Sequence, residues 1–480
     1  QDAEKVRQRR SRIVQTLHGD PAASPLGGAH KRGAPYSSHR APQRVRIGPS
    51  LAAALLDRLF EHPAILSSTA GENIRPMTSH STGITTPATL QFATALSRKS
   101  DTEAATRDLA DAIAMQLGAA PIDLVFVFFS AHHAANASMI SAMLQSELRA
   151  KVFLGCSGEG VIAGPEEIET AAAMTVLAAC LPDVRLTPLQ LSVSQLQDQI
   201  RMPGWPEPGL DDSTFLLFAD PFSTPMQEVL SLMTDRYPHG KVVGGLVGGG
   251  QDSGENRLLL NDQVFDGGVV GVQLAGAITV RTVTSQGCRP IGERFVVTRA
   301  EQNLIYELGG VSALKRLQDV FESMGGPQRR NAHRALHLGI VIDEHGSHFE
   351  RGDFLVRNLI GADQQAGAVA IGDVVQEGQT VQFHLRDAKS ASDDLHVLLA
   401  ADRTRRNSPP LGALLFSCCG RGEGLFNQPH HDSAAVQERL GPIPTAGFFA
   451  QGELGPVGGR NFLHGYTASV VIFSEPDSRT

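Results

Sequence analysis

Residues 445–473 read TAGFFAQGELGPVGGRNFLHGYTASVVIF, with six glycines between Thr445 and Gly465. An apolar segment of strand length lies on either side of these glycines. The stretch therefore predicts two buried strands joined by a glycine-rich connection. Polar side chains such as Glu453 and His464 lie within that connection, which makes it a candidate for chemistry or for ligand recognition.

The same pattern occurs twice more upstream. Each copy has an apolar strand, a helix, a second strand that runs into glycines, and a last apolar strand. The spacing of first to second strand is 28, 27 and 32 residues, and of second to last strand 20, 27 and 23. The anchors are Leu124, Val152 and Ala172, then Phe215, Val242 and Val269, then Ala413, Thr445 and Ala468. Repetition at this length indicates units that bury a common core together.

These repeats predict an α/β (α+β) fold with mixed β-sheets and helices packed outside. Because the third unit echoes the first two, we expect two interlocked halves related by pseudo-symmetry. An amphipathic helix is predicted over Glu103–Leu117, and a glycine-rich turn from Gly155 to Gly164. The stretch 274–410 differs, with strands joined by glycine turns and a helix beginning near Val311.

Composition indicates a globular protein of a reducing compartment. The 480 residues are 41% apolar and 19% charged. We find no secretory signal and no apolar run long enough to span a bilayer, so no membrane is expected. The five cysteines lack CxxC spacing, which argues against a disulfide framework and a structural zinc site and predicts a cytoplasmic location.

The charge is unevenly distributed along the chain. Residues 1–76 have a net charge of +6 and residues 77–480 a net charge of −14. The acidic body predicts no nucleic-acid partner, since affinity there comes largely from neutralising phosphates. Residues 1–84 form a basic extension rich in Pro, Gly, Ser and Arg, and disorder is the first prediction for it. A transit peptide, and a true start at Met77, are alternatives.

Two glycine-rich motifs only partly match catalytic or nucleotide-binding patterns. In LGCSGEG (154–160), Gly155 and Ser157 fit the first positions of a nucleophile elbow, but Glu159 stands where the last glycine belongs. A polar turn that faces a cavity is therefore favoured over a catalytic Ser157. The glycine spacing of GGLVGGGQDSG (244–254) is not that of a dinucleotide fingerprint.

The motif FSCCGRG (416–422) permits two functions at the end of a predicted strand. Cys418 or Cys419 is a nucleophile candidate with His464 as its base, although buried inert thiols are the favoured interpretation. Gly422 and Arg421 suit anion binding, because glycine admits close backbone N–H groups and arginine offers a bidentate fork. The histidine pairs, including His430–His431 before Asp432, lack the helical spacing of zinc hydrolases, and we predict no metal and no cofactor.

The last unit also carries a family pattern. GALLFSCCGRG followed by PTAGFFAQGELGPVGGRNFLHGYTAS resembles the C-terminal FIST domain. VFLGCSGEGVIAGPEEIE and KVVGGLVGG resemble the N-terminal FIST domain that precedes it. On this resemblance we assign 85–315 to the N-terminal and 316–475 to the C-terminal domain, with the boundary near helix 311–324. Cys419 departs from the pattern, where we expect a residue such as Asn before GRG.

The resemblance implies a stand-alone ligand-binding module of signal transduction, with an amino acid as the suggested ligand and a signalling protein as partner. On this view Arg421 holds a ligand carboxylate, Glu453 an amine, and His464 or Asn461 donates or accepts hydrogen bonds. The full set of predicted site residues is Ser157, Cys418, Arg421, Gly422, Phe448, Glu453, Asn461 and His464. A cysteine- or serine-dependent hydrolase or acyl transferase, and a protein-binding scaffold, are the alternatives.

Overall fold

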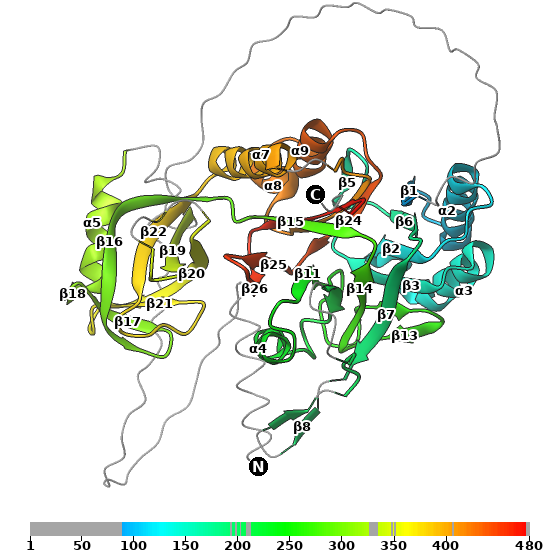
Figure 1. The fold of residues 1–480 in the computed structure, drawn as a ribbon. Helices are drawn as coiled ribbons and strands as arrows, with labels where there is room; N and C mark the ends of the chain where they lie inside the picture. The colour runs from blue at the N-terminus through cyan, green and yellow to red at the C-terminus, as the bar shows by residue number, and fades with distance from the viewer. Residues whose placement is uncertain are drawn as a thin grey trace, which may run out of the picture. The chain divides into compact units, whose positions relative to one another are not determined.

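Three mixed β-sheets, one for each repeat, make up most of the described chain. The computed structural model describes residues 89–476 except 193, 197–198, 202, 208–212, 326–334, 347–348, 350–351 and 406–407. The extension predicted over residues 1–84 lies outside the described residues. The prediction of mixed sheets with helices on their outer faces is confirmed (Figure 1).

The first repeat contributes four strands to its sheet and two helices that pack on the sheet. The strands are β1 (Gln91–Ser97), β2 (Leu124–Ser130), β3 (Val152–Gly158) and β6 (Met174–Cys180), and the helices are α2 (Thr102–Leu117) and α3 (Ala137–Leu148), with the 3-10 helix η2 (Ala131–Asn136) before α3. β2 and β3 pair in parallel, and β6 pairs antiparallel with β2 and β1. All residues of β2 are buried, as its continuous apolar run predicts. The predicted amphipathic helix is α2, which begins where Asp101 accepts a hydrogen bond from the N–H of Ala104.

The second and third repeats have the same strand arrangement. The second comprises β7 (Val184–Leu191), β10 (Thr214–Ala219), α4 (Met226–Arg236), β11 (Lys241–Leu246) and β14 (Val269–Gly276), with the small pair β8 (Ser194–Leu196) and β9 (Gln199–Arg201). The third comprises β15 (Thr279–Ser285), α7 (Ala388–Arg405), β23 (Gly412–Cys418), α8 (Gly422–Phe426), α9 (His431–Leu440), β24 (Thr445–Ala450) and β27 (Ala468–Ser474). In both, a parallel pair lies beside an antiparallel last strand and an antiparallel edge strand.

The repeats interlock in a cycle, because each one donates a hairpin to the sheet of another. The hairpins are β4 (Val161–Ala163) with β5 (Glu166–Ile168), β12 (Leu258–Leu260) with β13 (Gln263–Phe265), and β25 (Gly452–Val457) with β26 (Arg460–His464). The first joins β24 of the third repeat, the second joins β3 of the first, and the third joins β11 of the second. The interlocking that we expected between two halves therefore runs through three units.

Backbone hydrogen bonds close this cycle where the glycine strands end. The N–H of Glu159 donates to Phe449 O at 3.3 Å, that of Gly248 to Ser157 O at 3.4 Å, and that of Gln451 to Leu246 O at 3.0 Å. Each donor lies four residues after one of three equivalent strand glycines, Gly155, Gly244 and Gly447. Each acceptor lies two residues after another of these glycines. The three units thus share one local geometry.

The equivalent glycines are Gly155, Gly244 and Gly447, and each lies within a strand. A Cβ at any of them would overlap the carbonyl oxygen of its parallel neighbour, which is Val127, Leu217 or Leu415 respectively. The predicted turn from Gly155 to Gly164 is therefore wrong at its start, because β3 continues to Gly158. These glycines serve close strand approach rather than a turn.

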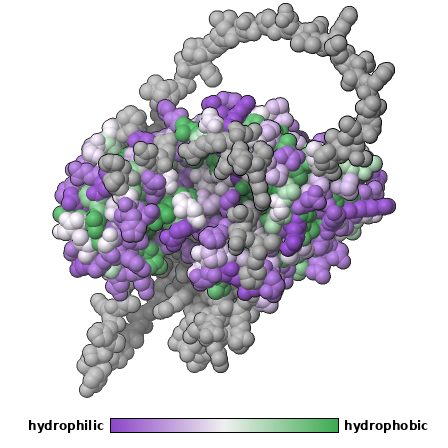
Figure 2. All heavy atoms as spheres, in the orientation of Figure 1, coloured by the Kyte–Doolittle hydropathy of each residue, from purple (hydrophilic) through white to green (hydrophobic). Residues whose placement is uncertain are grey.

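The inner faces of the three sheets share one hydrophobic core. The rings of Phe128, Phe218 and Phe416, one from the first strand of each repeat, meet with centroids 5.3–6.3 Å apart. The outer faces pack against α2 and α3, against α4, and against α7 and α9. On the face shown in Figure 2, hydrophilic residues predominate and apolar residues are scattered among them.

A seven-stranded antiparallel sheet is inserted between β15 and α7 of the third repeat, and six of its strands close into a barrel while β18 pairs with β17 at its side. Its elements are β16 (Cys288–Glu301), β17 (Leu304–Leu308), β18 (Val311–Ser312), α5 (Ala313–Ser323), β19 (Leu336–Val341), β20 (Phe354–Asp363), β21 (Ala368–Ile371) and β22 (Thr380–Arg386). The sheet closes because β16 pairs with both β22 and β17. The helix predicted near Val311 is α5, which packs on this barrel, so the division predicted between residues 315 and 316 falls within this helix.

Candidate functional site

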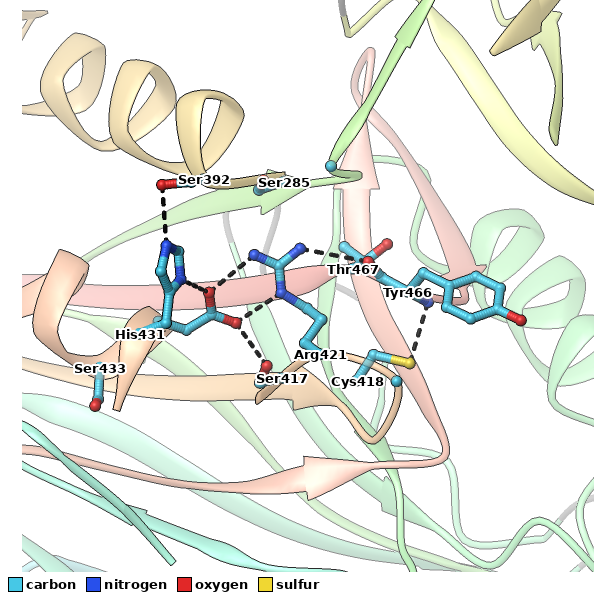
Figure 3. A network of polar contacts seen from close by, with 12 residues as sticks. Ser285, Ser392, Ser417, Cys418, Arg421, His431, Ser433, Tyr466 and Thr467 are labelled. Carbon is cyan, nitrogen blue, oxygen red and sulfur yellow. Dashed lines mark hydrogen bonds and ion pairs between the residues drawn. The ribbon is translucent and has the colours of Figure 1, made fainter. Parts of the chain in front are cut away.

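Polar side chains gather at the carboxyl ends of β23 and β24, next to the hairpin β25–β26 (Figure 3). Parallel strands end at the same edge of a sheet, so Ser417, Cys418 and the residues after them come close to the start of β25. Gly422 has a φ of +61°, and a Cβ there would overlap the carboxylate of Glu169. This turn directs the Arg421 side chain into the protein.

A buried ion pair forms one half of the cluster. Arg421 Nε lies 2.6 Å from Asp432 Oδ2 and Nη2 lies 2.9 Å from Oδ1, with both side chains at most 1% exposed. Ser417 Oγ donates to Asp432 Oδ2, and His431 Nδ1 lies 2.9 Å from Oδ1. Burial works to raise the pKa of Asp432, but the Arg421 charge together with the hydrogen bonds from Arg421, His431 and Ser417 outweighs it and holds that pKa well below its usual range.

The structure thus gives Arg421 a partner that sequence reasoning missed. Asp432 occupies the bidentate fork that we assigned to a ligand carboxylate. The sequence signal for this partner is Asp432 in HHD at 430–432, a motif that we interpret above only as a metal candidate. No group of three or more metal-ligating side chains suited to an ion occurs within the described part of the chain.

Glu453 and Cys418 form the other half of the cluster. The Glu453 carboxyl is fully buried, accepts from the Thr467 N–H at 2.9 Å through Oε2, and lies beside the Cys418 thiol. Its Oε1 has no partner among the described residues. Burial raises the pKa of Glu453 to about 8, and burial with the nearby Glu453 raises the pKa of Cys418 to about 12.

The barrel contributes a second arginine to this cluster. Arg386, at the end of β22, stacks 4.4 Å above the ring of Tyr466 and donates from Nη2 to Gly420 O at 2.7 Å. Its Nε is buried and has no hydrogen-bond partner within the described residues. His337 of β19 meets the same tyrosine edge to face at 5.3 Å.

Tyr466 itself has a strained backbone. Its φ is +64°, a left-handed conformation that is uncommon for an aromatic residue and is found most often at functional or clamped positions. Its N–H donates to Cys418 Sγ at 3.1 Å. A Cβ at Gly420 would lie 3.0 Å from the tyrosine ring, so the glycine makes room for it.

Of the eight predicted site residues, the structure brings Cys418, Arg421, Gly422 and Glu453 together. Ser157 lies in the first repeat, where its Oγ accepts from the Arg257 N–H at 3.0 Å. The Asn461 amide ties β26 to β11, accepting from the Val242 N–H and donating to Gly240 O. Phe448 belongs to the aromatic core, 5.2 Å from Phe128.

His464 lies opposite Glu453 across the β25–β26 pairing, but its imidazole is bound elsewhere. Nε2 lies 2.9 Å from Gly455 O, and burial lowers the pKa of His464 to about 4. Cys418 is instead surrounded by Glu453 and the N–H of Tyr466. Cys418 and His464, the hypothesised nucleophile and base, therefore each contact other groups.

Comparison with protein families agrees with this architecture. The FIST N domain model matches residues 123–311 and the FIST C domain model matches residues 313–456, together more than half of the chain. The chain belongs to the FIST family. The predicted order of a FIST N domain followed by a FIST C domain is confirmed. FIST domains are associated with sensory ligand binding in signal transduction.

Relatives of this FIST protein occur in mycobacteria. It is 39% identical over 350 residues to the uncharacterized protein Rv0628c of Mycobacterium tuberculosis H37Rv, which covers 73% of this chain and 91% of the relative. It is 39% identical over 356 residues to the uncharacterized protein Mb0898c of Mycobacterium bovis, with 74% and 91% covered. Among the described residues, none of the helices combines the length and apolar character needed to cross a bilayer.

Proposed function

We propose that this FIST protein is a cytoplasmic sensor that binds an α-amino acid between the third repeat and the barrel and signals through a protein partner. One observation carries the proposal: two buried polar atoms of opposite chemistry, Arg386 Nε and Glu453 Oε1, have no partner among the described residues. Unpartnered buried polar atoms are rare in proteins and need an explanation. The five free thiols support the cytoplasmic location.

The chemistry of the two atoms matches the two ends of an amino acid. A guanidinium Nε donates to a carboxylate, and a carboxylate oxygen accepts from an ammonium. The two groups are close enough for the Arg386 charge to act on the Glu453 carboxyl. Arg421 is held by Asp432, so in this proposal it stays paired behind the ligand and Arg386 takes the carboxylate.

Tyr466 controls access to these atoms in the proposal. Its ring is stacked against Arg386, and its N–H and that of Thr467 bond Cys418 and Glu453. A ligand must therefore displace or rotate Tyr466, whose left-handed backbone already stores strain. Because both partners of the ring, Arg386 and His337, belong to the barrel, ligand entry would change a contact between barrel and repeat.

A thermal-shift screen of the 20 amino acids tests the proposal on the full chain. We expect at least one of them to raise Tm in proportion to its excess over Kd, and both Arg386→Ala and Glu453→Gln to abolish that shift. The matched control is Arg299→Ala, because Arg299 also stacks on a tyrosine of the barrel, Tyr306 at 4.8 Å. The proposal fails if no amino acid shifts Tm, or if the two site variants respond like the control.

The hydrolase alternative receives no support from the thiol. A nucleophilic cysteine needs a lowered pKa, whereas burial raises the pKa of Cys418 to about 12. We expect a thiol-directed electrophile at neutral pH to show no preference for Cys418 when labelled sites are read by mass spectrometry. Selective labelling of Cys418 would favour the enzyme instead.

A further inference from the structure

We propose that the ligand's ammonium group binds by exchange, replacing a proton that neutralises Glu453 in the free protein. The inference rests on the proposed function and adds its regulation: binding releases a proton, so affinity depends on pH. The starting observation is the Glu453 carboxyl itself, which is fully buried and leaves Oε1 without a partner in the described part of the chain.

Among the residues that the structure describes, the groups that face Glu453 do not include a cation in contact with it. From β23 comes the Cys418 thiol, and from the last connection comes the Thr467 N–H. Arg421 follows β23, but its charge is compensated by Asp432 at 2.6 Å. Arg386 acts from the barrel, while its contacts are the Tyr466 ring and Gly420 O.

A buried carboxylate without a paired cation is costly, and such groups take up a proton instead. Two neutral donors stabilise the ionised form to some extent, and the two arginines do so from further away, yet burial is the larger effect. The raised pKa of Glu453, about 8, agrees with this balance. The free site is thus a neutral acid beside the Arg386 cation.

The exchange step balances without any further reactant. The O–H bond of the Glu453 carboxyl breaks, its proton passes to the solvent buffer, and the carboxylate left behind pairs with the ligand's –NH₃⁺. The ligand's carboxylate pairs with Arg386. The ligand enters as a zwitterion and adds no net charge. The net charge of the site therefore falls by one, which is the charge of the released proton.

Calorimetric titration of the full chain at pH 7 tests the step. Each of the 20 amino acids is titrated in phosphate and in Tris, two buffers of different ionisation enthalpy. For any amino acid that binds, we expect the difference in observed heat to correspond to release of about one proton, and affinity to rise about tenfold from pH 6 to pH 7. Ligand binding to the control variant Asp220→Asn, which is altered in the second repeat, should release the same number of protons as binding to the wild type.

Two outcomes separate this inference from the proposed function. Binding with equal heats in both buffers would overturn the exchange and leave the amino-acid site standing, whereas no binding by any amino acid would overturn both. A ligand-free measurement gives an independent decision. In the 13C NMR spectrum of glutamate-labelled protein, the signal that Glu453→Gln removes should titrate well above pH 4.5, and titration at an ordinary value would sink the proposal.

Discussion

The second and third repeats each place a buried carboxyl at the edge where their parallel strands end, with opposite outcomes. Asp220 follows β10 directly, is fully buried, and has both oxygens occupied. Oδ2 accepts from Ser223 N–H and Oγ at 2.9 and 2.7 Å, and Oδ1 accepts from Asn256 Nδ2 at 2.9 Å. Glu453 leaves one oxygen without a partner among the described residues.

The comparison shows that the backbone arrangement common to the three repeats serves the fold. The buried polar side chains, in contrast, differ from one repeat to another. Strand pairing, the strand glycines and the cyclic backbone bonds recur in all three units. What differs is whether the buried polar groups are satisfied internally. At Asp220 of the second repeat both carboxyl oxygens are occupied, as expected of a loop anchor, and at Glu453 of the third repeat one oxygen leaves room for a ligand.

The largest effect is expected from breaking the ion pair behind the site. Arg421→Ala leaves the Asp432 carboxylate buried and unpaired, which should lower the free energy of unfolding by about 3–5 kcal/mol. Urea denaturation monitored by circular dichroism measures this loss. Arg421→Met combined with Asp432→Leu should lose less than the single change, and a single-variant loss under about 1 kcal/mol would contradict the buried pairing.

Isosteric amides should separate the two carboxyls of the comparison. Asp220→Asn replaces an acceptor by a donor opposite the donors of Ser223 and Asn256, so it should cost about 1–3 kcal/mol at pH 7. Glu453→Gln should not destabilise, because the carboxyl it replaces is already neutral. The same denaturation series compares them, and equal losses in both variants would remove the distinction between the repeats.

Stability against pH gives an effect with a definite sign. The pKa of Glu453 rises from 4.5 to about 8 on folding, and burial with the nearby Asp432 raises the pKa of Glu167 from 4.5 to about 7. In the unfolded chain both groups lose their protons as pH rises through 4.5, while the folded protein keeps them. These groups therefore make the free energy of unfolding fall between pH 4.5 and about 8.

Glutamine variants report which carboxyl causes that fall. Glu453→Gln should flatten the profile of stability against pH up to about pH 8, and Glu167→Gln should do so up to about pH 7. Glu167 accepts a hydrogen bond from the Ser433 N–H and so links the first and third repeats. Tm measured from pH 5 to pH 9 provides the test. A profile unchanged by both substitutions would mean that neither carboxyl holds its proton in the folded state.

Local pattern was enough to predict the repeats and even part of their register. The anchor pairs Leu124 with Val152, Phe215 with Val242, and Ala413 with Thr445 are direct partners in the parallel pairings. Continuous apolar runs and strand glycines carry that information within each unit. The exchange of hairpins was not predictable, because a hairpin's own sequence does not state which sheet edge it joins.

The candidate site was predictable only in part. The glycine turn after Cys418 and the isolated Glu453 are visible in the sequence, and the structure brings both to the same edge of the third repeat. Arg386 lies in the inserted barrel, so its stacking on Tyr466 depends on how two chain-distant elements pack. The pairing of Arg421 with Asp432 likewise depends on where α9 begins, because the start of this helix brings the motif HHD next to Arg421.

The most direct test of the central claim compares ligand response in the two repeats. Tm of the full chain is measured with and without the amino acids in the wild type, in Asp220→Asn and in Glu453→Gln, each against its own ligand-free value. Our account predicts that the amino acid that shifts the wild type also shifts Asp220→Asn and leaves Glu453→Gln unchanged. An undiminished shift in Glu453→Gln would contradict a ligand site at the third repeat.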